Sequence, residues 1–529
     1  MESQGAGPER AFILGLDGVP WGKLREWTRA GELPAFARLF DEGAAGPLES
    51  TTPATTPLAW PSIATGVWPD QHGIYAFQRL TGEYSHRMYT SDWVKRPALW
   101  DIVSPAVVGN VPMTYPATAI DGKMVTGMMT PEQGEGFTHP PALGDEIERR
   151  IPNYEIGLDW GEYADRPDEL QRDIDDLVAA RRELLDLLLA DDDWRLAFFV
   201  FTAPDRLQHL VWDDDVLLAL YRRMDDILAD VIARVASLDA ALFVVSDHGF
   251  GPVDRVANVN RILADAGLLE PKGGDGTRGL FERVGVTRER VQTALKRVGI
   301  DDDALVQHLP RTLVDAVASE LPGDHELYDI DYGATAAFMN GPGTVFVNDD
   351  ERFANGSVSA ADRDRVKATV AEHLAGARDP ETGERPLTVY DGATVFPADP
   401  DAPDLVVESE RYALRTSLAD EPFGPPGSVA GDHRKEGILF AWGPGIDPGA
   451  RPEGAAVVDI APTVLHALGE PVPESAAGRV LESVFSPDST PANRPIETRA
   501  YDGPAGEGDT AAESLDGVED RLRGLGYME

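Results

Sequence analysis

The sequence predicts an α/β fold with a central, mostly parallel sheet flanked by helices. Short, continuous apolar runs recur along the chain, as expected for parallel strands that are covered on both faces. Most of these runs lead into a loop and then into a helical pattern, which is the order of a β–α unit. Several runs end in Asp, or are followed closely by Asp and His, and ligands bind at that edge of an open α/β sheet.

The composition describes a large chain without cysteine. Its 529 residues suffice for one enlarged α/β domain or for two or three smaller ones. The lack of cysteine excludes disulfides, thiolate metal ligands and cysteine nucleophiles. A transition metal would therefore have to be held by histidine and carboxylate side chains.

The net charge of −44 is the most unusual property of the chain. Acidic residues are spread over its whole length and only seven residues are lysine, which indicates a solvated acidic surface. Such a surface is typical of cytosolic proteins in salt-accumulating halophiles, where molar salt screens the charge. The same charge argues against nucleic acid as a partner that is bound through a basic face.

Membrane and export signals are not visible in the sequence. No apolar stretch reaches the ~20 residues that a helix needs to cross a bilayer. The first residues, MESQGAGPER, contain neither the basic region nor the apolar region of a signal peptide. We therefore expect a cytoplasmic protein.

The first predicted strand, AFILGLD, places Asp17 at its carboxyl end. Ligand residues lie at this end of the strands in open α/β sheets, although a lone Asp there is more often a helix cap. Helices over 21–29 and 33–42 follow. The next predicted elements are strands over 106–112 and 124–129 and helices over 143–152 and 167–191.

A threonine-rich stretch, TTPATTPLAWPSIATG, covers residues 51–66. Its apolar part has helical character, and we expect a helix that begins close to Thr56 and ends at 65–66. The Thr56 hydroxyl would then lie at a helix N-terminus, where backbone N–H groups and the helix dipole favour an anion. Taken alone, Thr56 could equally be an ordinary N-cap.

Two later strands also lead into candidate ligands. The run LAFFVFT continues into Asp205 and His209, which are four residues apart and therefore share one helical face. This pair could chelate a metal, although an Asp–His pair at this spacing is more often a surface ion pair. The run ALFVVS continues into Asp247 and His248. Three strand ends of this kind are hard to attribute to chance in a chain with ten histidines.

The later part of the chain supplies one more candidate ligand. His433 lies within AGDHRKEGILFAW, in a predicted loop before a strand. The helix over 459–468 has Asp459 as its N-cap and Gly469 just past its end, and we expect its His466 to be a packing or surface residue. Further predicted elements are a helix over 214–237, amphipathic helices near 287–298 and 303–319, a hairpin of strands over 335–340 and 344–348, a helix over 360–374, strands over 387–389 and 404–407, and a helix over 515–527.

These elements predict a core that is interrupted by an insertion. The first part of the core covers residues 10–253 and the second part covers 426–485. Between them, 254–425 form an inserted helical and α+β cap region. Residues 486–529 are rich in Pro, Thr, Asp, Glu and Gly and are predicted to form a linker and a C-terminal helix.

The candidate ligands form one constellation of hydroxyl, carboxylate and imidazole groups. All but one lie at or just beyond a strand end or at a helix start. This set of ligand groups matches a site in which two divalent cations lie beside one hydroxyl nucleophile. The seven residues are Asp17, Thr56, Asp205, His209, Asp247, His248 and His433.

Six motifs in order between residues 11 and about 468 resemble a known family. The chain resembles members of the alkaline phosphatase superfamily, specifically of its type I phosphodiesterase/nucleotide pyrophosphatase family. Within that family it resembles the haloarchaeal type. The motifs are GLDG at 15–18, TxxAWxSxxTG at 56–66, PDxHGI at 69–74, DRxxH at 205–209, SDHGF at 246–250, and GDHRxEG at 431–437 with GPGI at 443–446.

The resemblance implies an alkaline-phosphatase-like fold and a metal-dependent hydrolase of phosphodiester or pyrophosphate bonds. Thr56 would be the nucleophile and would form a phosphothreonine intermediate that water then hydrolyses. The substrate would be a small phosphorylated molecule, with nucleotides among the candidates. Zn²⁺ is the expected metal and Mn²⁺ the alternative, because histidine and carboxylate suit either ion. One metal would be held by Asp17, Thr56, Asp247 and His248, and the other by Asp205, His209 and His433.

The motif around Thr56 departs from the family pattern. Well-studied nucleotide pyrophosphatases carry Asn three residues after the nucleophile, where this chain has Ala59, so nucleotide specificity does not follow from the resemblance. If the motif were aligned a few residues out of place, the nucleophile would be assigned wrongly to Thr51, Thr52 or Thr55. We expect His72, in a turn motif, to be structural.

Two other functions remain as alternatives. A phosphomonoesterase or phosphotransferase of the same superfamily would use the same metal site, because the inserted segments set the size of the substrate. A non-catalytic, acidic metal-binding protein is disfavoured because all seven site positions are filled. A sulfatase would need Cys, or Ser in a C/S-x-P-x-R context, and the chain has no such motif near Thr56.

Overall fold

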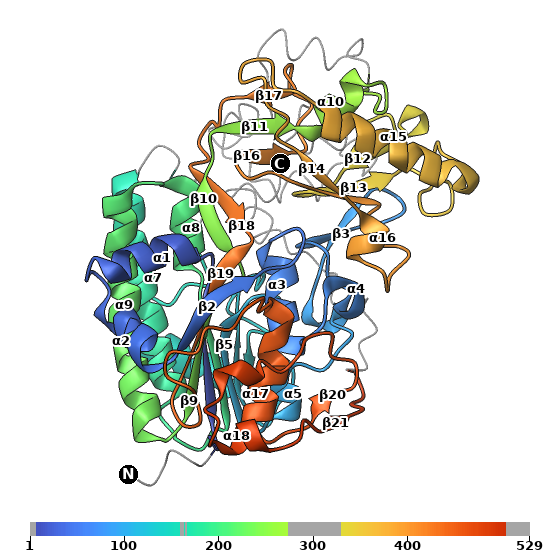
Figure 1. The fold of residues 1–529 in the computed structure, drawn as a ribbon. Helices are drawn as coiled ribbons and strands as arrows, with labels where there is room; N and C mark the ends of the chain where they lie inside the picture. The colour runs from blue at the N-terminus through green and yellow to red at the C-terminus, as the bar shows by residue number, and fades with distance from the viewer. Residues whose placement is uncertain (1–6, 159–162, 164–166, 273–328, 504–529) are drawn as a thin grey trace, which may run out of the picture.

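The structure, a computed structural model, describes residues 7–158, 163, 167–272 and 329–503. Figure 1 shows a larger body built around one sheet and a smaller body above it. The chain leaves the larger body through β10 (Gly249–Pro252) and returns through β18 (Gly431–Arg434), and these two strands pair antiparallel. We call the larger body the core, and we call the described residues between β10 and β18 the cap.

Within the described residues, the core sheet has eight strands. They are β1 (Ala11–Leu16), β2 (Ala44–Glu49), β5 (Ala106–Val111), β6 (Gly122–Thr126), β7 (Thr138–His139), β8 (Leu196–Phe201), β9 (Ala241–Val245) and β19 (Glu436–Trp442). Their order in the sheet is β2-β19-β9-β1-β8-β5-β6-β7. From β9 to β6 the strands run parallel, whereas β2, β19 and β7 extend the sheet through antiparallel pairs. The predicted α/β class with a mostly parallel sheet is confirmed.

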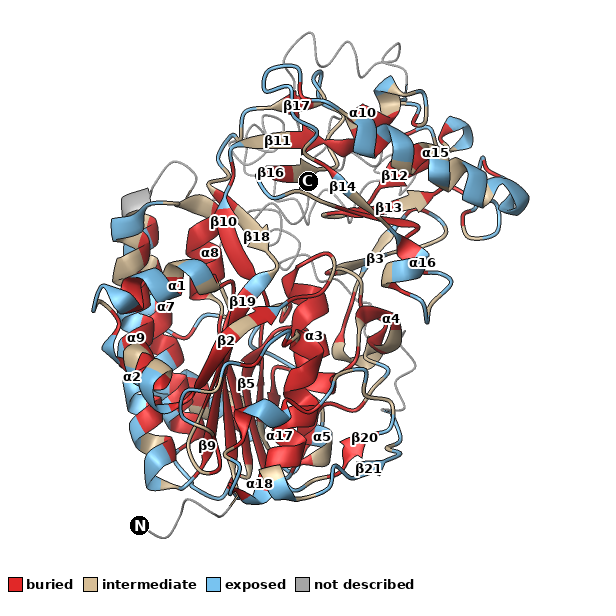
Figure 2. Cartoon of the chain, viewed as in Figure 1, coloured by how far each residue is buried: buried red, intermediate tan, exposed pale blue. Residues whose placement is uncertain are grey.

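Helices cover both faces of this sheet, which explains the continuous apolar runs. In β1, Phe12 and Leu14 pack into one hydrophobic cluster, whereas Ala11 and Ile13 pack into the other. On one face lie α1 (Trp21–Arg29), α2 (Pro34–Glu42), α7 (Pro167–Leu188), α8 (Ala203–Leu210) and α9 (Asp214–Ser237); on the other lie α3 (Thr56–Thr65), α5 (Leu99–Ile102) and α17 (Ile460–Leu468). Figure 2 shows the strands buried and the outer faces of α1, α2, α7 and α9 exposed, whereas every residue of α3 and α17 is buried.

The cap has its own sheets and its own hydrophobic cluster. The predicted hairpin is confirmed, because β12 and β13 pair antiparallel and the Asn340 amide donates to the Thr344 carbonyl at 2.9 Å. The cap elements are β11 (Arg255–Asn258), α10 (Val259–Asp265), β12 (Ala337–Met339), β13 (Thr344–Val347), α15 (Arg363–Gly376), β14 (Thr388–Asp391), α16 (Gly392–Val395), β15 (Leu405–Glu408), β16 (Tyr412–Arg415) and β17 (Phe423–Gly424).

The remaining described elements lie on the core side. They are α4 (Pro69–His72), the hairpin of β3 (Gln78–Leu80) and β4 (His86–Met88), α6 (Ala142–Arg150), β20 (Val472–Pro473), α18 (Thr490–Asn493), β21 (Thr498–Arg499) and short 3₁₀ turns. Residues 486–503, expected as part of a linker, contain α18 and β21. Because β21 pairs with β20, this segment lies against the core. The helices expected near 287–298, 303–319 and 515–527 lie outside the described residues.

The following three details are among the differences from the sequence-based expectations. The strand β2 was not expected, because Gly46 and Pro47 interrupt its pattern; both are tolerated on this edge strand, which among the described strands of the sheet has β19 as its one neighbour. His433 lies in the strand β18 rather than in a loop, because its partner β10 completes a ladder. Asp459 does not cap α17 through its side chain; its carboxylate instead accepts from the amides of Ala456 and Arg479.

Candidate active site

The sheet brings three of the candidate carboxylates together. Asp17 follows β1, Asp247 follows β9, and Asp205 lies in the first turn of α8 after β8. In the sheet β1 lies between β8 and β9, so the carboxyl ends of these neighbouring parallel strands meet at one edge. All three carboxylates are fully buried.

One group of ligand atoms consists of Asp17, Asp247 and His248. His248 Nε2 lies 3.6 Å from Asp17 Oδ1 and 3.2 Å from Asp247 Oδ2. His248 Nδ1 lies 3.0 Å from the Gly249 carbonyl, which can only accept, so Nδ1 carries the proton. The lone pair of Nε2 therefore faces the two carboxylates, an arrangement that is suited to a cation between them.

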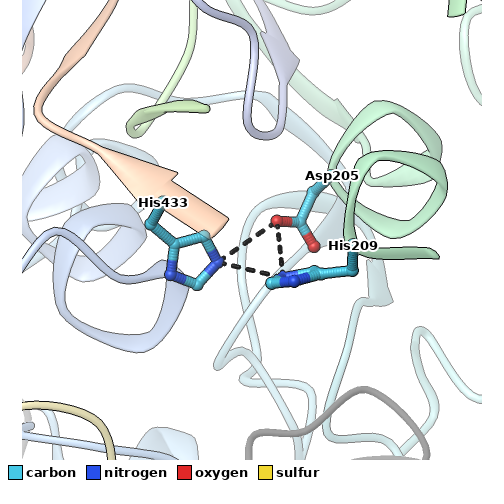
Figure 3. Close-up of side chains that lie close together, drawn as sticks. All are labelled: Asp205, His209 and His433. Carbon is cyan, nitrogen blue, oxygen red and sulfur yellow. Dashed lines mark hydrogen bonds and ion pairs between the residues drawn. The ribbon is translucent and has the colours of Figure 1, made fainter. Parts of the chain in front are cut away.

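The second group consists of Asp205, His209 and His433, which Figure 3 shows in close-up. Nε2 of each imidazole lies 3.4 Å from Asp205 Oδ2, and the two Nε2 atoms lie 3.2 Å apart. Asp205 and His209 come from α8, whereas His433 comes from β18 on the return from the cap. The two groups are neighbours, because the ring centres of His248 and His433 lie 4.2 Å apart.

Thr56 is the first residue of α3, and its side chain faces the first group. Its Oγ1 lies 3.3 Å from His248 Nε2. The N-cap position belongs to Thr55, and the helix has no side-chain cap at all, so Thr56 is not an ordinary capping residue. Its hydroxyl is fully buried, as expected for a group that acts inside a site rather than at the surface.

The start of α3 offers fewer amide donors than a typical helix N-terminus. Pro57 has no N–H, and the amides of Leu58 and Ala59 both donate to the Thr55 carbonyl. The Thr56 amide has no acceptor among the described residues, so it remains available for an anion. Ala59 itself is fully buried, so its side chain packs in the interior of the core.

Burial and charge shift the pKa values of the ligand groups strongly. Burial raises the pKa of Asp17 well above its ordinary value, and the carboxylates of Asp247 and Asp205 raise it further. Burial, followed by the charge of Asp205, raises the pKa of Asp247 to about 8. Burial, followed by the charge of His433, lowers the pKa of His248 to about 4. These groups resist the charged state because like charges are crowded in a buried site.

Asp205 behaves differently from the other two carboxyl groups. Burial alone would raise its pKa, but the attraction and hydrogen bond of His209 and the hydrogen bond of His433 outweigh it. Arg206, also buried, lies 3.5 Å from the Asp205 carboxylate and lowers its pKa further. The Asp205 carboxylate is therefore held ionised, which is the form that binds a metal.

The donor set fits divalent cations. Asp17 Oδ1 and Asp247 Oδ2 are buried and find no hydrogen-bond donor among the described residues, although their carboxylates would otherwise need one. Within each group the ligand atoms lie within 4.8 Å of one another. Nitrogen and oxygen ligands of this kind suit a borderline or hard divalent ion. The structure therefore contains two candidate metal sites beside one hydroxyl.

Several supporting contacts were not anticipated from the sequence. Trp60, one helical turn after Thr56, donates from Nε1 to Asp17 Oδ2 at 3.1 Å. The Ser246 hydroxyl accepts from the Val19 amide at 2.8 Å and donates to the His248 carbonyl at 2.6 Å. A sequence signal that could have found Trp60 is its i, i+4 spacing from Thr56, which places both side chains on one helical face.

The other hydroxyl and imidazole candidates have different surroundings. Thr51 donates to the Pro53 carbonyl, and Thr52 accepts from Lys435. His72 is fully buried, with Nε2 at 3.1 Å from Ser62 Oγ and Nδ1 accepting from the Ile74 amide. The buried His466 lies in α17, 2.8 Å from the Pro491 carbonyl.

Comparison with known proteins identifies the family. The model of the type I phosphodiesterase / nucleotide pyrophosphatase family matches residues 11–428, which is most of the chain. The chain therefore belongs to this family, as the sequence motifs predicted. It is a hydrolase that acts on phosphoric ester bonds. No curated protein matches the chain.

Three solved structures resemble the chain at low sequence identity. Murine ectonucleotide pyrophosphatase/phosphodiesterase 5, as an inactive variant in complex with AMP, is 13% identical with a TM-score of 0.49, covering 88% of this chain and 96% of that one. A second murine structure of that protein is 14% identical with a TM-score of 0.48 and the same coverage. The human protein is 12% identical with a TM-score of 0.48, covering 87% of this chain and 95% of that one.

None of the helices in the described part of the chain combines the length and the apolar character that a bilayer crossing requires.

Proposed function

We propose that the protein hydrolyses phosphodiester or pyrophosphate bonds through Thr56, with two divalent cations. The observation that carries this proposal is the position of Thr56 Oγ1, 3.3 Å from His248 Nε2 at the edge of two buried ligand groups. A hydroxyl in this position has the surroundings that a phosphoryl-accepting nucleophile needs. Family membership supports the same class of reaction.

The residues of the two groups would hold the cations. Asp17, Thr56, Asp247 and His248 would hold one, and Asp205, His209 and His433 would hold the other. When bound, the cations would lower the pKa of the Thr56 hydroxyl and offset the charge that develops on the phosphoryl and leaving-group oxygens. We propose Zn²⁺, with Mn²⁺ as the alternative, because the donor atoms suit both ions.

The reaction would proceed in two displacements. Thr56 Oγ1 loses its proton to solvent and forms a bond to phosphorus as the bond to the leaving oxygen breaks; the leaving oxygen takes up a proton from solvent, and a phosphothreonine results. Water then loses a proton and forms the new bond to phosphorus while the Thr56 Oγ1–phosphorus bond breaks, and Oγ1 takes up a proton, which restores the threonine. Burial and the charge of His433 lower the pKa of His248 to about 4, so at neutral pH its Nε2 lone pair is unprotonated and available to a cation that Thr56 Oγ1, 3.3 Å away, would also contact. The free Thr56 amide can donate to a phosphoryl oxygen.

The experiment compares Thr56→Ala and Thr56→Ser with wild type and with Thr55→Ala as the neighbouring-hydroxyl control. Protein is purified in high salt, its bound metal is measured, and hydrolysis of bis-p-nitrophenyl phosphate and p-nitrophenyl phosphate is followed. We expect Thr56→Ala to lose about 10³-fold or more in kcat on the diester, and Thr56→Ser to retain part of the activity. Full diester activity in Thr56→Ala would refute the proposal. A preference for the monoester would support the phosphomonoesterase alternative instead.

We further propose that the core and the inserted region have separate roles. The core, expected over 10–253 and 426–485, would carry the chemistry. The insertion, expected over 254–425, would set the size and polarity of the substrate. The strongly acidic composition favours a halophilic, cytoplasmic protein, which would be most stable in molar salt.

A further inference from the structure

A cavity of about 560 Å³ lies where the core meets the cap, directly beside the candidate active site. Pro53, Thr55 and His433 line it on the core side, and Tyr390 and Glu408 line it on the cap side. The volume falls in the range of small-molecule sites in proteins. Because Thr55 and His433 line the cavity beside Thr56 and the second ligand group, a group attached to a phosphorus atom at Thr56 would extend into it.

Three side chains from distant segments meet on the wall of the cavity. Lys435 Nζ lies 3.1 Å from Glu408 Oε2 and donates to Thr52 Oγ1 at 2.9 Å. It also lies over the ring of Tyr390, 5.0 Å from the ring centre. The cluster thus combines an acceptor carboxylate, a donor ammonium group and an aromatic face.

The other charged residues of the wall make the cavity unfavourable for additional phosphate. The Arg434 guanidinium donates to the carbonyls of His433 and Pro252, and Arg411 pairs with Asp254. Lys435 is paired with Glu408. The cations of the wall are therefore already engaged, while the carboxylates of Asp432 and Glu410 also line the cavity. Four carboxylates, those of Glu408, Glu410, Asp432 and Glu436, line the cavity against three cations, so a second phosphate group would meet a wall with excess negative charge.

We propose, building on the proposed function, that this cavity binds an uncharged, hydroxyl-rich ester group such as a sugar or polyol. Glu408 would accept hydrogen bonds from hydroxyl groups, Lys435 would donate to them, and the Tyr390 ring would pack against their carbon face. Tyr390 and Glu408 would be specificity-determining residues. The enzyme would therefore cleave phosphodiesters of such groups in preference to nucleotide pyrophosphates.

The test measures kcat/KM of the metal-loaded, full-length enzyme in high salt on three substrates. They are glycerophosphoinositol, thymidine 5′-monophosphate p-nitrophenyl ester and ATP. We expect kcat/KM on glycerophosphoinositol to be at least tenfold higher than kcat/KM on ATP. It should also be higher than kcat/KM on the thymidine ester. A higher kcat/KM on ATP or on the thymidine ester would overturn the proposal.

Variants then assign the preference to the cavity. Glu408→Gln removes the acceptor charge but keeps the shape, so we expect the ratio of kcat/KM on glycerophosphoinositol to that on ATP to fall about tenfold, mainly through KM. Tyr390→Ala should raise KM for glycerophosphoinositol more than Tyr390→Phe does. Glu372→Gln, on the exposed face of α15, is the matched control and should leave the ratio unchanged. An unchanged ratio in Glu408→Gln would contradict the assignment.

The test of the cavity can fail without contradicting the proposed function of Thr56, and the two results can be told apart. Hydrolysis of bis-p-nitrophenyl phosphate by wild type, and its loss in Thr56→Ala, reports on the nucleophile alone. If that activity is present while glycerophosphoinositol is not preferred, only the inference about the cavity is overturned. Thermal unfolding of each variant shows whether a change in KM reflects the wall of the cavity or a loss of folding.

Discussion

Trp60 Nε1 donates a hydrogen bond to Asp17 Oδ2 at 3.1 Å, and this contact joins the helix of the candidate nucleophile to the end of β1. It leaves Asp17 Oδ1 turned toward His248, 3.6 Å from Nε2. The indole thus fixes which carboxylate oxygen faces the first ligand group. Such outer hydrogen bonds orient metal ligands and affect metal affinity.

Trp60→Phe should therefore weaken metal binding. We expect about a tenfold or greater loss of affinity for the metal equivalent that Asp17 would hold, because Asp17 is no longer oriented. Competition with a chromogenic chelator measures this change. Trp100→Phe is the matched control, because Trp60 and Trp100 both pack against Phe198, with ring centres 6.1 and 6.0 Å away. Equal losses in the two variants would show that packing, not the hydrogen bond, is responsible.

His433→Ala should remove one metal equivalent. The second ligand group would retain only Asp205 and His209, and two ligands hold a transition metal much more weakly than three. Metal analysis after gel filtration, with wild type near two equivalents, checks this expectation. His466→Gln serves as the control, because that buried imidazole contacts the Pro491 carbonyl and should affect stability rather than metal content. Two equivalents bound by His433→Ala would contradict the assignment.

His72 should make the folded state sensitive to acid. Burial lowers its pKa to about 3 in the folded protein, against an ordinary value of 6.5. Below pH 6.5 the imidazole of the unfolded chain binds a proton, whereas in the folded state it stays neutral down to about pH 3. This histidine therefore lowers the free energy of unfolding as pH falls from 6.5 toward 3 and has no effect on it above pH 6.5. The slope is at most about 1.4 kcal/mol per pH unit.

The measurement is urea unfolding of wild type and His72→Gln at pH 7.5, 6.0 and 5.0. The variant loses the hydrogen bond to Ser62 and should be less stable at pH 7.5. The difference in the free energy of unfolding between wild type and this variant should shrink as the pH falls, because the variant lacks the titrating imidazole. A difference that stays constant from pH 7.5 to 5.0 would contradict the proposed titration.

Gly15→Ala should destabilise the protein and disturb the site. A Cβ atom at this position would lie 2.4 Å from the Trp60 ring and 2.8 Å from Val200, so the indole must move. We expect a loss of about 1–3 kcal/mol in the free energy of unfolding from overpacking, together with weaker metal binding. In Gly22→Ala, a new Cβ would meet nothing within 4 Å in helix α1, so this control should be neutral or slightly stabilising.

Much of the fold was predictable because its signals are local. Helices α1, α2 and α9 match their predicted ranges within a residue, since apolar periodicity and capping act over a few residues. The strand β2 was missed because its edge position, which tolerates Pro47, depends on pairing with β19, far away in the sequence. The same holds for His433, whose strand exists only through its ladder with β10.

The sequence by itself determined the family, the types of ligand and the edge of the sheet at which three of them lie. It did so because parallel strands end at a common edge and because the motifs are short. Only the tertiary structure decided that Trp60 holds Asp17, that the Thr56 amide has no acceptor among the described residues, and that Tyr390, Glu408 and Lys435 share one cavity wall. These contacts join segments without any periodic relation, so packing alone brings them together.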